Sequence, residues 1–443
     1  MAEFLQRVHG LVWGAPALVM ILGVGIYLTV RTGCVQLRLL PRALGRFSRM
    51  IAGREGGGKS SFRCLCTALG ATVGTGNLVG VAGAICLGGP GSIFWMWICA
   101  LLGMVTKYAE VVLAMRYRIR EENSWVGGPM YVISRGLGEK WKPLASIYCF
   151  LGVFAAFGVG NATQVNALLE SVNQLGIGAY PGGNLILGLM LSVLVWLLLS
   201  GGMERIGRTA ERLVPLAAGG YILLCLLVLV FRRAYLPGAF SAILLGAFSP
   251  EAVTGGVLGS VLCALRVGCA RGVFTNEAGM GTASMAHAGA ETQNPAEQGM
   301  MGIVEVFLDT IVICTLTALA ILVSGVEIPY GVDLGGRLTG MAFQRVLGSW
   351  SGVFLAGAIA CFAIASILGW GFYGIRCARY LLGPGSEKYF VLLQALVVMV
   401  GAVLKTGTVW TLAEIMNGLM AIPNLVALGL LSREVVRLTP GCK

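Results

Sequence analysis

Long apolar stretches recur along the whole chain, and they restrict its fold more than any other feature. A helix needs about 20 apolar residues to cross the hydrocarbon core of a bilayer. The sequence holds eleven such stretches, separated by short polar segments. They span residues 11–30, 64–86, 92–115, 144–172, 184–200, 212–231, 262–289, 299–325, 351–378, 388–405 and 410–431. The sequence therefore predicts an all-α polytopic membrane protein with about eleven transmembrane helices.

The composition excludes most soluble classes. Hydrophobic residues make up 57% of the 443 residues and charged residues only 12%, about half the charged share of an average soluble domain. The 13 Cys lie mostly inside apolar stretches and form no CxxC pair, which favours buried small side chains over metal or disulfide chemistry. With two His, no HExxH zinc site is present. We expect no enzyme activity and no cofactor.

Basic residues are concentrated in alternate polar segments, which predicts the orientation in the cell membrane. Segment 31–63 carries eight Lys or Arg against one acid. The other basic segments are 116–142, 203–212, 376–388 and 432–443, whereas Arg232 and Arg233 are the main exception in the remaining loops. Cytoplasmic loops of membrane proteins are enriched in Lys and Arg. The N-terminus is therefore expected outside and the C-terminus in the cytoplasm, and the net charge of +12 does not indicate nucleic acid.

Two crossings are interrupted by glycine near their middle. Residues 70–80 contain four glycines, and residues 272–281 contain three glycines together with Asn276 and Glu277. Each glycine weakens a helix by about 1 kcal/mol relative to alanine. Backbone that leaves a helix inside a bilayer must be satisfied by protein, water or ligand. Close helix packing is the alternative explanation, because GxxxG patterns also occur in plain bundles.

The interrupted crossings occupy matching places in two five-helix halves of opposite topology. Such pairs are the best sequence indication of a transporter's binding site. This arrangement predicts an inverted repeat of five plus five helices after one extra N-terminal helix. The expected parts are residues 1–31 (N-terminal helix), 32–63 (basic cytoplasmic loop), 64–235 (first repeat), 236–261 (external loop with an amphipathic or re-entrant helix), 262–433 (second repeat) and 434–443 (cytoplasmic tail).

A broken helix can bind both ends of a zwitterion. The free N–H groups of one half-helix bind a carboxylate, and the free carbonyls of the other coordinate a cation or an ammonium group. In the first break Thr75, Gly76 and Asn77 are expected to hold the substrate carboxylate, unless they only cap the helix. In the second break, the substrate contacts are expected from Phe274, Thr275 and Asn276, and Glu277 is a charge at membrane depth.

Several long motifs resemble the alanine/glycine:cation symporter family, also called sodium:alanine symporters. They are residues 74–77 continued by 88–97, residues 102–110, residues 276–282 with 286–288, and residues 367–370. The resemblance covers almost the whole chain. It implies a leucine-transporter-type fold with one extra helix, and Na⁺-coupled import of small neutral amino acids such as alanine and glycine.

The resemblance also implies further site residues. The carbonyls of Gly70 and Val73 and the hydroxyl of Ser366 are the expected Na⁺ ligands, while Gln164 and Trp370 are expected to line the substrate pocket. Phe157 and Asn161 share a helix face with Gln164, where they line the pocket or contact a neighbouring helix. The sequence departs from the family at Ala365, where a hydroxyl is usual, and at Ile375, where an acid is usual. The missing hydroxyl leaves the ion, Na⁺ or H⁺, open.

Two other patterns carry less weight. Residues 53–60 match GxxxxGK[ST], but a nucleotide-binding loop needs a preceding strand and a surrounding domain, so we expect no nucleotide. Lys107 and Glu110 are three residues apart and are expected to pair near the cytoplasmic end. An ion channel, a membrane enzyme and an amino-acid sensor without transport are the competing functions, and the missing hydroxyl leaves the sensor open.

Overall fold

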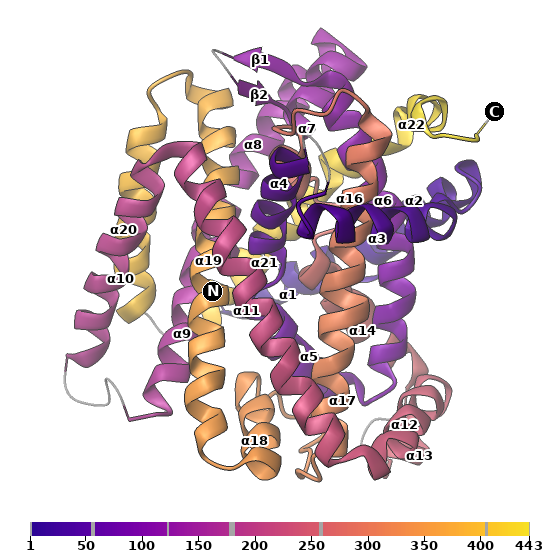
Figure 1. Cartoon of the computed structure of the whole chain (residues 1–443), viewed down its shortest axis with the longest axis vertical. Helices are drawn as coiled ribbons and strands as arrows, with labels where there is room; N and C mark the ends of the chain where they lie inside the picture. The colour runs from indigo at the N-terminus through magenta and orange to yellow at the C-terminus, as the bar shows by residue number, and fades with distance from the viewer. Residues whose placement is uncertain are drawn as a thin grey trace.

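The computed structural model describes residues 2–54, 58–121, 124–176, 182–256, 260–403 and 406–442. Nearly all of this part of the chain is helical (Figure 1). One antiparallel hairpin is present among the described residues, with β1 (Ile119–Glu121) paired to β2 (Ser124–Val126) so that Ile119 faces Val126.

Helical elements follow one another with short connections. The first part of the chain forms α1 (Ala2–Val12), α2 (Ala15–Arg31), α3 (Val35–Ile51), α4 (Gly58–Thr72), η1 (Gly76–Gly80), α5 (Val81–Gly88), α6 (Ser92–Tyr117), α7 (Pro129–Tyr131), η2 (Val132–Leu137), η3 (Glu139–Trp141), α8 (Lys142–Phe157), η4 (Gly158–Ala162), α9 (Thr163–Asn173), α10 (Gly183–Ser200) and α11 (Gly202–Phe231). The rest forms η5 (Arg233–Tyr235), α12 (Leu236–Phe248), α13 (Pro250–Thr254), α14 (Val261–Asn276), α15 (Thr282–His287), α16 (Pro295–Val306), η6 (Phe307–Cys314), α17 (Thr315–Val323), α18 (Gly336–Leu347), α19 (Trp350–Leu382), α20 (Glu387–Val403), α21 (Thr406–Leu430) and α22 (Ser432–Leu438).

The chain is a multi-pass helical membrane protein. Within the described ranges, seven helices are long and apolar enough to cross a membrane, or up to nine when each bent pair forms one crossing. Two other expected crossings rest on α14 and α20, which have 16 and 17 residues and so fall short of the usual 20. The number eleven therefore remains a prediction, whereas the fold class and the presence of broken helices are confirmed.

Two segments expected as loops contain helices. The basic segment 32–63 includes α3, which is amphipathic and buries Val35, Leu39 and Met50. The many arginines of this segment made it look like a polar loop. One of them, Arg46, is buried and pairs with Glu297 at 3.3 Å. The segment 326–350 includes α18 in the same way. α3 and α18 are amphipathic and shorter than a bilayer crossing, so their sequences show no apolar run of about 20 residues.

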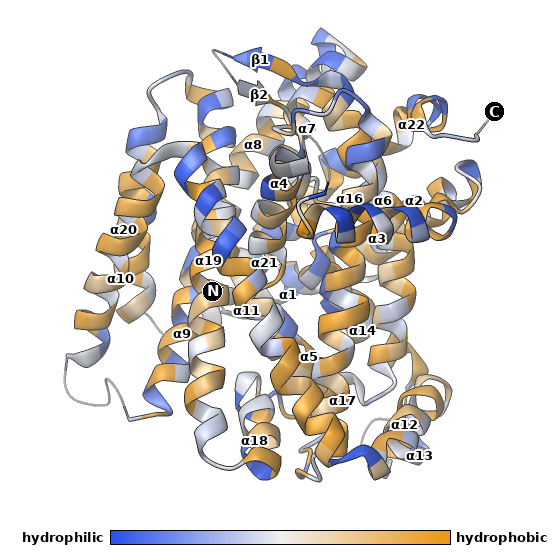
Figure 2. Cartoon of the chain, viewed as in Figure 1, coloured by the Kyte–Doolittle hydropathy of each residue, from blue (hydrophilic) through white to orange (hydrophobic). Residues whose placement is uncertain are grey.

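Polar connections gather at two opposite ends of the molecule. In Figure 1 the hairpin, α22 and the turn between α19 and α20 lie at the upper end, while α12, α13 and α18 lie at the lower end. Figure 2 shows mainly hydrophobic helices between these ends. The alternation of connections agrees with the charge pattern, because the basic segments share one end. Which end faces the cytoplasm remains a prediction.

The interrupted crossings lie in the middle of the helix bundle. α6 packs against α14 and α16, and α4 packs against α11, α15 and α19. Small residues at the contacts allow this approach: a Cβ on Gly272 would lie 3.3 Å from the Cβ of Cys99, so α14 and α6 are close at that level. The packing brings the two breaks together.

Candidate functional site between two broken helices

The first break separates α4 from η1. The helices on its two sides, Ser60–Thr72 and Gly76–Gly88, are bent by 49°. The N–H of Gly74 donates to Oδ1 of Asn77 at 3.0 Å, whereas an α-helix would direct it to the carbonyl of Gly70. The Gly70 carbonyl is thereby released from the helix pattern. A π-helical turn follows at Gly76–Gly80, a form often found at functional sites.

The second break separates α14 from α15. Its five residues include Glu277, Gly279 and Gly281, whose φ angles are 54°, 98° and 77°. Left-handed backbone favours glycine, which explains two of the three glycines in this sequence run. Glu277 is the C-cap of α14, so the helix ends there instead of crossing the membrane without interruption.

The two breaks contact each other at Gly76. A Cβ on Gly76 would lie 3.3 Å from the Cγ2 of Thr275 and 3.8 Å from the Cδ1 of Phe274. The hydroxyl of Thr275 donates to the carbonyls of Arg271 and Gly272 at 3.0 and 2.9 Å. Thr275 therefore presents its methyl group to the first break, and its hydroxyl is not the free polar contact that the sequence suggested.

Thr75 and Gln164 meet beside the first break. The Thr75 hydroxyl donates to Oε1 of Gln164 at 3.0 Å, and Nε2 of Gln164 donates to the carbonyl of Val159 at 3.1 Å. Both side chains are buried. The helix that carries Gln164 begins directly after the π turn η4. The structure thus brings together two residues that are 89 positions apart in the sequence.

A buried acid that the sequence analysis did not select joins the two breaks. Nδ2 of Asn77 donates to Oδ1 of Asp309 at 2.7 Å, and the Thr310 hydroxyl donates to Oδ2 of Asp309 at 2.8 Å. Nδ2 of Asn276 in turn donates to the Thr310 hydroxyl at 3.3 Å. Asp309 is fully buried in the π turn η6. The signal was a carboxylate in the apolar run 299–325, which Asp309 shares with Glu305, because ionisable residues at membrane depth are functional by default.

The expected cation ligands also converge. The Ser366 hydroxyl is completely buried and has no hydrogen-bond partner among the described residues. A Cβ on Gly74 would lie 2.6 Å from this oxygen, and one on Gly70 would lie 3.3 Å from the carbonyl of Ala365. Val73 is buried beside them. A buried hydroxyl oxygen without a partner, next to a break that releases carbonyls, is the kind of ligand that hard cations prefer.

Three expected pocket residues make other contacts. The Phe157 ring stacks on Phe390, with 5.1 Å between ring centroids. Asn161 donates to the carbonyl of Gln394 at 2.8 Å, which is the helix-contact alternative. Trp370 packs against Gly160, where any Cβ would overlap it, and lies within hydrogen-bonding reach of Glu277.

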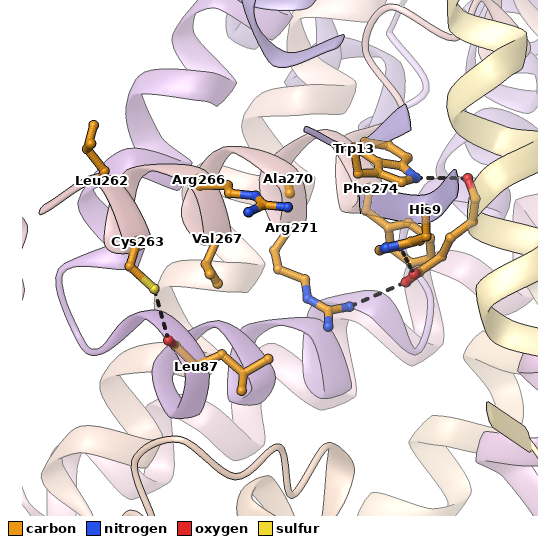
Figure 3. Close-up of a pocket in the computed structure, with 11 residues that line it drawn as sticks. His9, Trp13, Leu87, Leu262, Cys263, Arg266, Val267, Ala270, Arg271 and Phe274 are labelled. Carbon is orange, nitrogen blue, oxygen red and sulfur yellow. Dashed lines mark hydrogen bonds and ion pairs between the residues drawn. The ribbon is translucent and has the colours of Figure 1, made fainter. Parts of the chain in front are cut away.

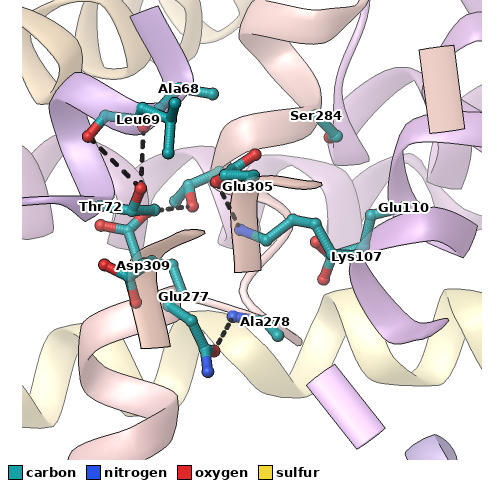
Figure 4. A network of polar contacts seen from close by, with 12 residues as sticks. Ala68, Leu69, Thr72, Lys107, Glu110, Glu277, Ala278, Ser284, Glu305 and Asp309 are labelled. Carbon is teal, nitrogen blue, oxygen red and sulfur yellow. Dashed lines mark hydrogen bonds and ion pairs between the residues drawn. The ribbon is translucent and has the colours of Figure 1, made fainter. Parts of the chain in front are cut away.

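Buried charges surround the second break (Figure 4). Oε1 of Glu110 accepts bonds from the N–H groups of Gly279 and Gly281 at 2.8 and 3.1 Å, and from Nδ2 of Asn424 at 2.8 Å. Glu277 accepts a bond of 2.6 Å from Thr282. Glu110 thus satisfies two backbone N–H groups of the break that precedes α15, a role that its sequence position did not reveal.

Lys107 pairs with a different acid from the one expected. Its Nζ lies 3.2 Å from Oε1 of Glu305, and the other oxygen of Glu305 lies 3.0 Å from Nε2 of His287. All three side chains are fully buried. The expected pairing of Lys107 with Glu110 rested on helix spacing alone. It is wrong because Glu110 turns to the amides of the second break and α16 supplies the partner for Lys107.

The structure describes only part of the run 53–60 that matches the nucleotide-loop pattern. Residues 55–57 of the run 53–60 lie outside the described residues, and the rest of the run leads into α4.

Fold and site together define a multi-pass membrane protein with a buried polar site between two broken helices. The model of the sodium:alanine symporter family matches residues 1–441. The chain belongs to this family. Its members are cation-coupled amino-acid symporters and not enzymes, which confirms the expected transporter class.

Curated relatives match along nearly their full length. An uncharacterized transporter of Haemophilus influenzae is 41% identical over 442 residues, which cover 99% of this chain and 95% of that protein. The sodium/alanine symporter AgcS of Methanococcus maripaludis is 41% identical over 440 residues, covering 98% and 95%. The probable sodium/glutamine symporter GlnT of Bacillus subtilis is 36% identical over 442 residues, covering 98% and 90%.

Proposed function

We propose that the protein imports small neutral amino acids, such as alanine and glycine, together with Na⁺. The observation that carries the proposal is the meeting of the two breaks at Gly76, with Thr75, Gln164 and Asp309 as buried polar groups around it. Family membership supports the coarser function, cation-coupled amino-acid symport. The names of the relatives include both alanine and glutamine symporters, so the substrate has to be argued from the site.

The substrate carboxylate lies against Thr75 and Gly76 at the start of η1. Backbone N–H groups at a helical N-terminus favour an anion, and Gly76 leaves room for close approach. The ammonium group faces the carboxyl end of α14 and the negative charge of Asp309. Phe274 and the Thr275 methyl close the pocket beside Gly76, so that a methyl side chain fits and larger side chains collide with the ring.

The coupling ion lies between the carbonyls of Gly70 and Val73 and the hydroxyl of Ser366. Ser366 supports this placement because its buried oxygen has no partner among the described residues, and an unsatisfied buried hydroxyl costs about 1–3 kcal/mol. Ala365 removes one oxygen that the family normally provides, which weakens Na⁺ binding. Following the charge pattern, the N-terminus lies outside and the C-terminus in the cytoplasm of the cell membrane.

Uptake into proteoliposomes tests the proposal. Radiolabelled alanine, glycine, glutamine and leucine are offered with an inward Na⁺ gradient, and in parallel with a proton gradient alone. We expect Na⁺-driven uptake of alanine and glycine, and a Ser366→Ala variant with almost no dependence on Na⁺. If Ser366→Ala kept the unmutated sodium curve, the ion would lie elsewhere.

A proton-driven transporter and a sensor without transport are the alternatives, and Ala365 is the observation that favours them. Uptake driven by the proton gradient alone identifies the first. Saturable alanine binding without counterflow in the same vesicles identifies the second.

A further inference from the structure

A cavity of about 630 Å³ lies at the upper end of the helix bundle, where α10 leads into α11 and α19 leads into α20. Ser124 of the hairpin also lines it. Its volume lies within the roughly 300–1,000 Å³ typical of small-molecule sites. Among the described residues that line it, none belongs to either broken helix. The site between the breaks therefore does not account for this cavity.

Arginine side chains line this cavity and a second one, but they differ in burial. In the cavity beside α14 (Figure 3), Arg266 is exposed and Arg271 lies 3.7 Å from Glu414. In the cavity at the upper end, Arg376 is only 8% exposed. Its Nε is buried without a hydrogen-bond partner, and no ion pair joins its guanidinium to any described residue. Its Cζ lies 5.3 Å from the centre of the Phe372 ring, which is a contact but not a counter-ion.

The acids at this end of α19 are engaged by another arginine. Nε of Arg379 lies 3.0 Å from Oε2 of Glu121, and its Nη1 lies 2.8 Å from Oε1 of Glu387. Lys388 is exposed and adds a positive charge to the lining. Around the cavity the described residues thus comprise three basic side chains, Arg376, Arg379 and Lys388, and two acids. A buried charge without a partner is costly, so the cavity favours an anion.

Another part of the cavity wall is apolar and reaches the outside of the bundle. Trp196, Leu199, Met203 and Val391 line it. α10 and α20 form the left edge of the molecule in Figure 1, and Figure 2 shows them mainly hydrophobic below their upper ends. Trp196 is 45% exposed, and tryptophan is enriched where a membrane meets water. A ligand of this cavity can therefore place an anionic group at Arg376 and a hydrocarbon part along α10 and α20.

We propose that this cavity binds the phosphate group of an anionic phospholipid. Guanidinium groups bind phosphate oxygens strongly, often with two parallel hydrogen bonds. Basic pockets between transmembrane helices on the cytoplasmic side bind anionic lipid headgroups, and the charge pattern predicts that side for this end. The phosphate accepts hydrogen bonds from Arg376, while the acyl chains follow exposed leucines of α10 and α20, which include Leu197 and Leu392.

A free phosphate ion is the other source of the same chemistry. It would pair with Arg376 equally well, but it would leave the apolar wall in contact with water. The lipid satisfies both parts of the wall, and it is the source that the structure favours. The proposal does not depend on which solute the protein transports.

Native mass spectrometry of the full-length protein in detergent tests the binding. Phosphatidylglycerol and phosphatidylcholine with the same acyl chains are titrated in parallel. We expect one tight phosphatidylglycerol molecule, and Arg376→Gln should weaken it about tenfold or more, because a charge-assisted hydrogen bond is lost. Arg345→Gln, at an exposed arginine of α18, is the matched control and should bind as the unmutated protein does. Equal affinity for the two lipids would overturn the proposal.

Thermal unfolding separates a lipid site from a purely structural role of Arg376. Phosphatidylglycerol should raise the unfolding temperature of the unmutated protein and leave that of Arg376→Gln unchanged. Without lipid, Arg376→Gln should unfold at the same or a higher temperature, because a buried charge without a counter-ion is removed. An unfolding temperature that falls in Arg376→Gln, with a full response to phosphatidylglycerol, would show a structural role and overturn the proposal.

A second variant covers the case in which Arg376→Gln does not fold. Ser200 is exposed and lines the cavity, so Ser200→Glu adds a carboxylate that repels the phosphate. Ser349→Glu, at an exposed serine of the opposite end, is its control. Unchanged phosphatidylglycerol binding in Ser200→Glu would refute the site. Inorganic phosphate is the last probe: if it raises the unfolding temperature and phosphatidylglycerol does not, the lipid assignment is wrong and the cavity binds free phosphate.

Discussion

The two broken helices differ in what fills them. In the second break the backbone is satisfied by the protein: Glu110 accepts the N–H groups of Gly279 and Gly281, and Tyr148 donates to the carbonyl of Met280 at 2.9 Å. In the first break the Ser366 hydroxyl has no partner among the described residues. The carboxylate of Glu110 thus occupies the backbone N–H groups directly before α15.

This difference divides the roles of the breaks. The amides of Gly279 and Gly281 already hold a protein carboxylate, so they are not available to a substrate carboxylate. This supports our proposal that the first break binds the ligand, with the carboxyl end of α14, Phe274 and Asn276 contributed by the second. Glu110 keeps the second break open without a ligand, so that its geometry is preformed.

The largest effect is expected from a bulky residue in the first break. Gly76→Leu should abolish alanine binding, because the new side chain meets Thr275 and Phe274 at the position of the carboxylate. Radioligand binding on detergent-purified protein measures it, with size-exclusion chromatography to confirm folding. Gly219→Leu, where a Cβ meets nothing within 4 Å, is the matched control. Normal alanine binding by Gly76→Leu would place the pocket elsewhere.

A substitution at the second break should instead lower the stability of the fold. Glu110→Ala leaves two buried N–H groups without an acceptor, at about 1–3 kcal/mol each, so the thermal unfolding temperature should fall clearly. The fraction that remains folded should bind alanine with nearly unchanged affinity. Glu139→Ala, whose side chain is 82% exposed, serves as control. Lost affinity with unchanged unfolding would show that Glu110 faces the ligand.

Phe274 links the two breaks, because its side chain belongs to the second break and contacts the first at Gly76. Phe274→Ala should admit longer side chains, and one methylene of fit in an apolar pocket is worth about 1–3 kcal/mol. Competition of leucine and glutamine against labelled alanine measures the change. Equal binding of leucine and alanine by the unmutated protein would contradict size selection by this ring.

The smallest expected change concerns the ion near the first break. Ala365→Thr restores an oxygen beside Gly70, and a gain of about 1.4 kcal/mol lowers the half-saturating Na⁺ concentration about tenfold. Sodium titrations of alanine uptake at fixed substrate check the shift. An unchanged titration would mean that position 365 does not contribute a ligand.

Local signals in the sequence predicted the breaks, but not how each is filled. Glycine runs weaken a helix wherever it packs, so both interruptions could be found in the sequence. Ser366 followed from the family resemblance. Asp309 and Glu110 depend on partners more than 160 residues away, Asn77 and Gly279, which no spacing rule reports. Phe157 was selected because it shares a face with Gln164, yet its ring turns to α20.

The buried pair of Lys107 and Glu305 also has a consequence for biosynthesis. The two residues are 198 positions apart (305 − 107). Since synthesis adds about 5–20 residues per second, Lys107 is made about 10–40 s before Glu305. During that time a lysine at the centre of a helix costs about 2.5–3.5 kcal/mol to insert into lipid. Until α16 emerges, α6 is therefore less stable in lipid than in the finished bundle. A truncated chain that ends before residue 305 should be degraded faster than the full chain.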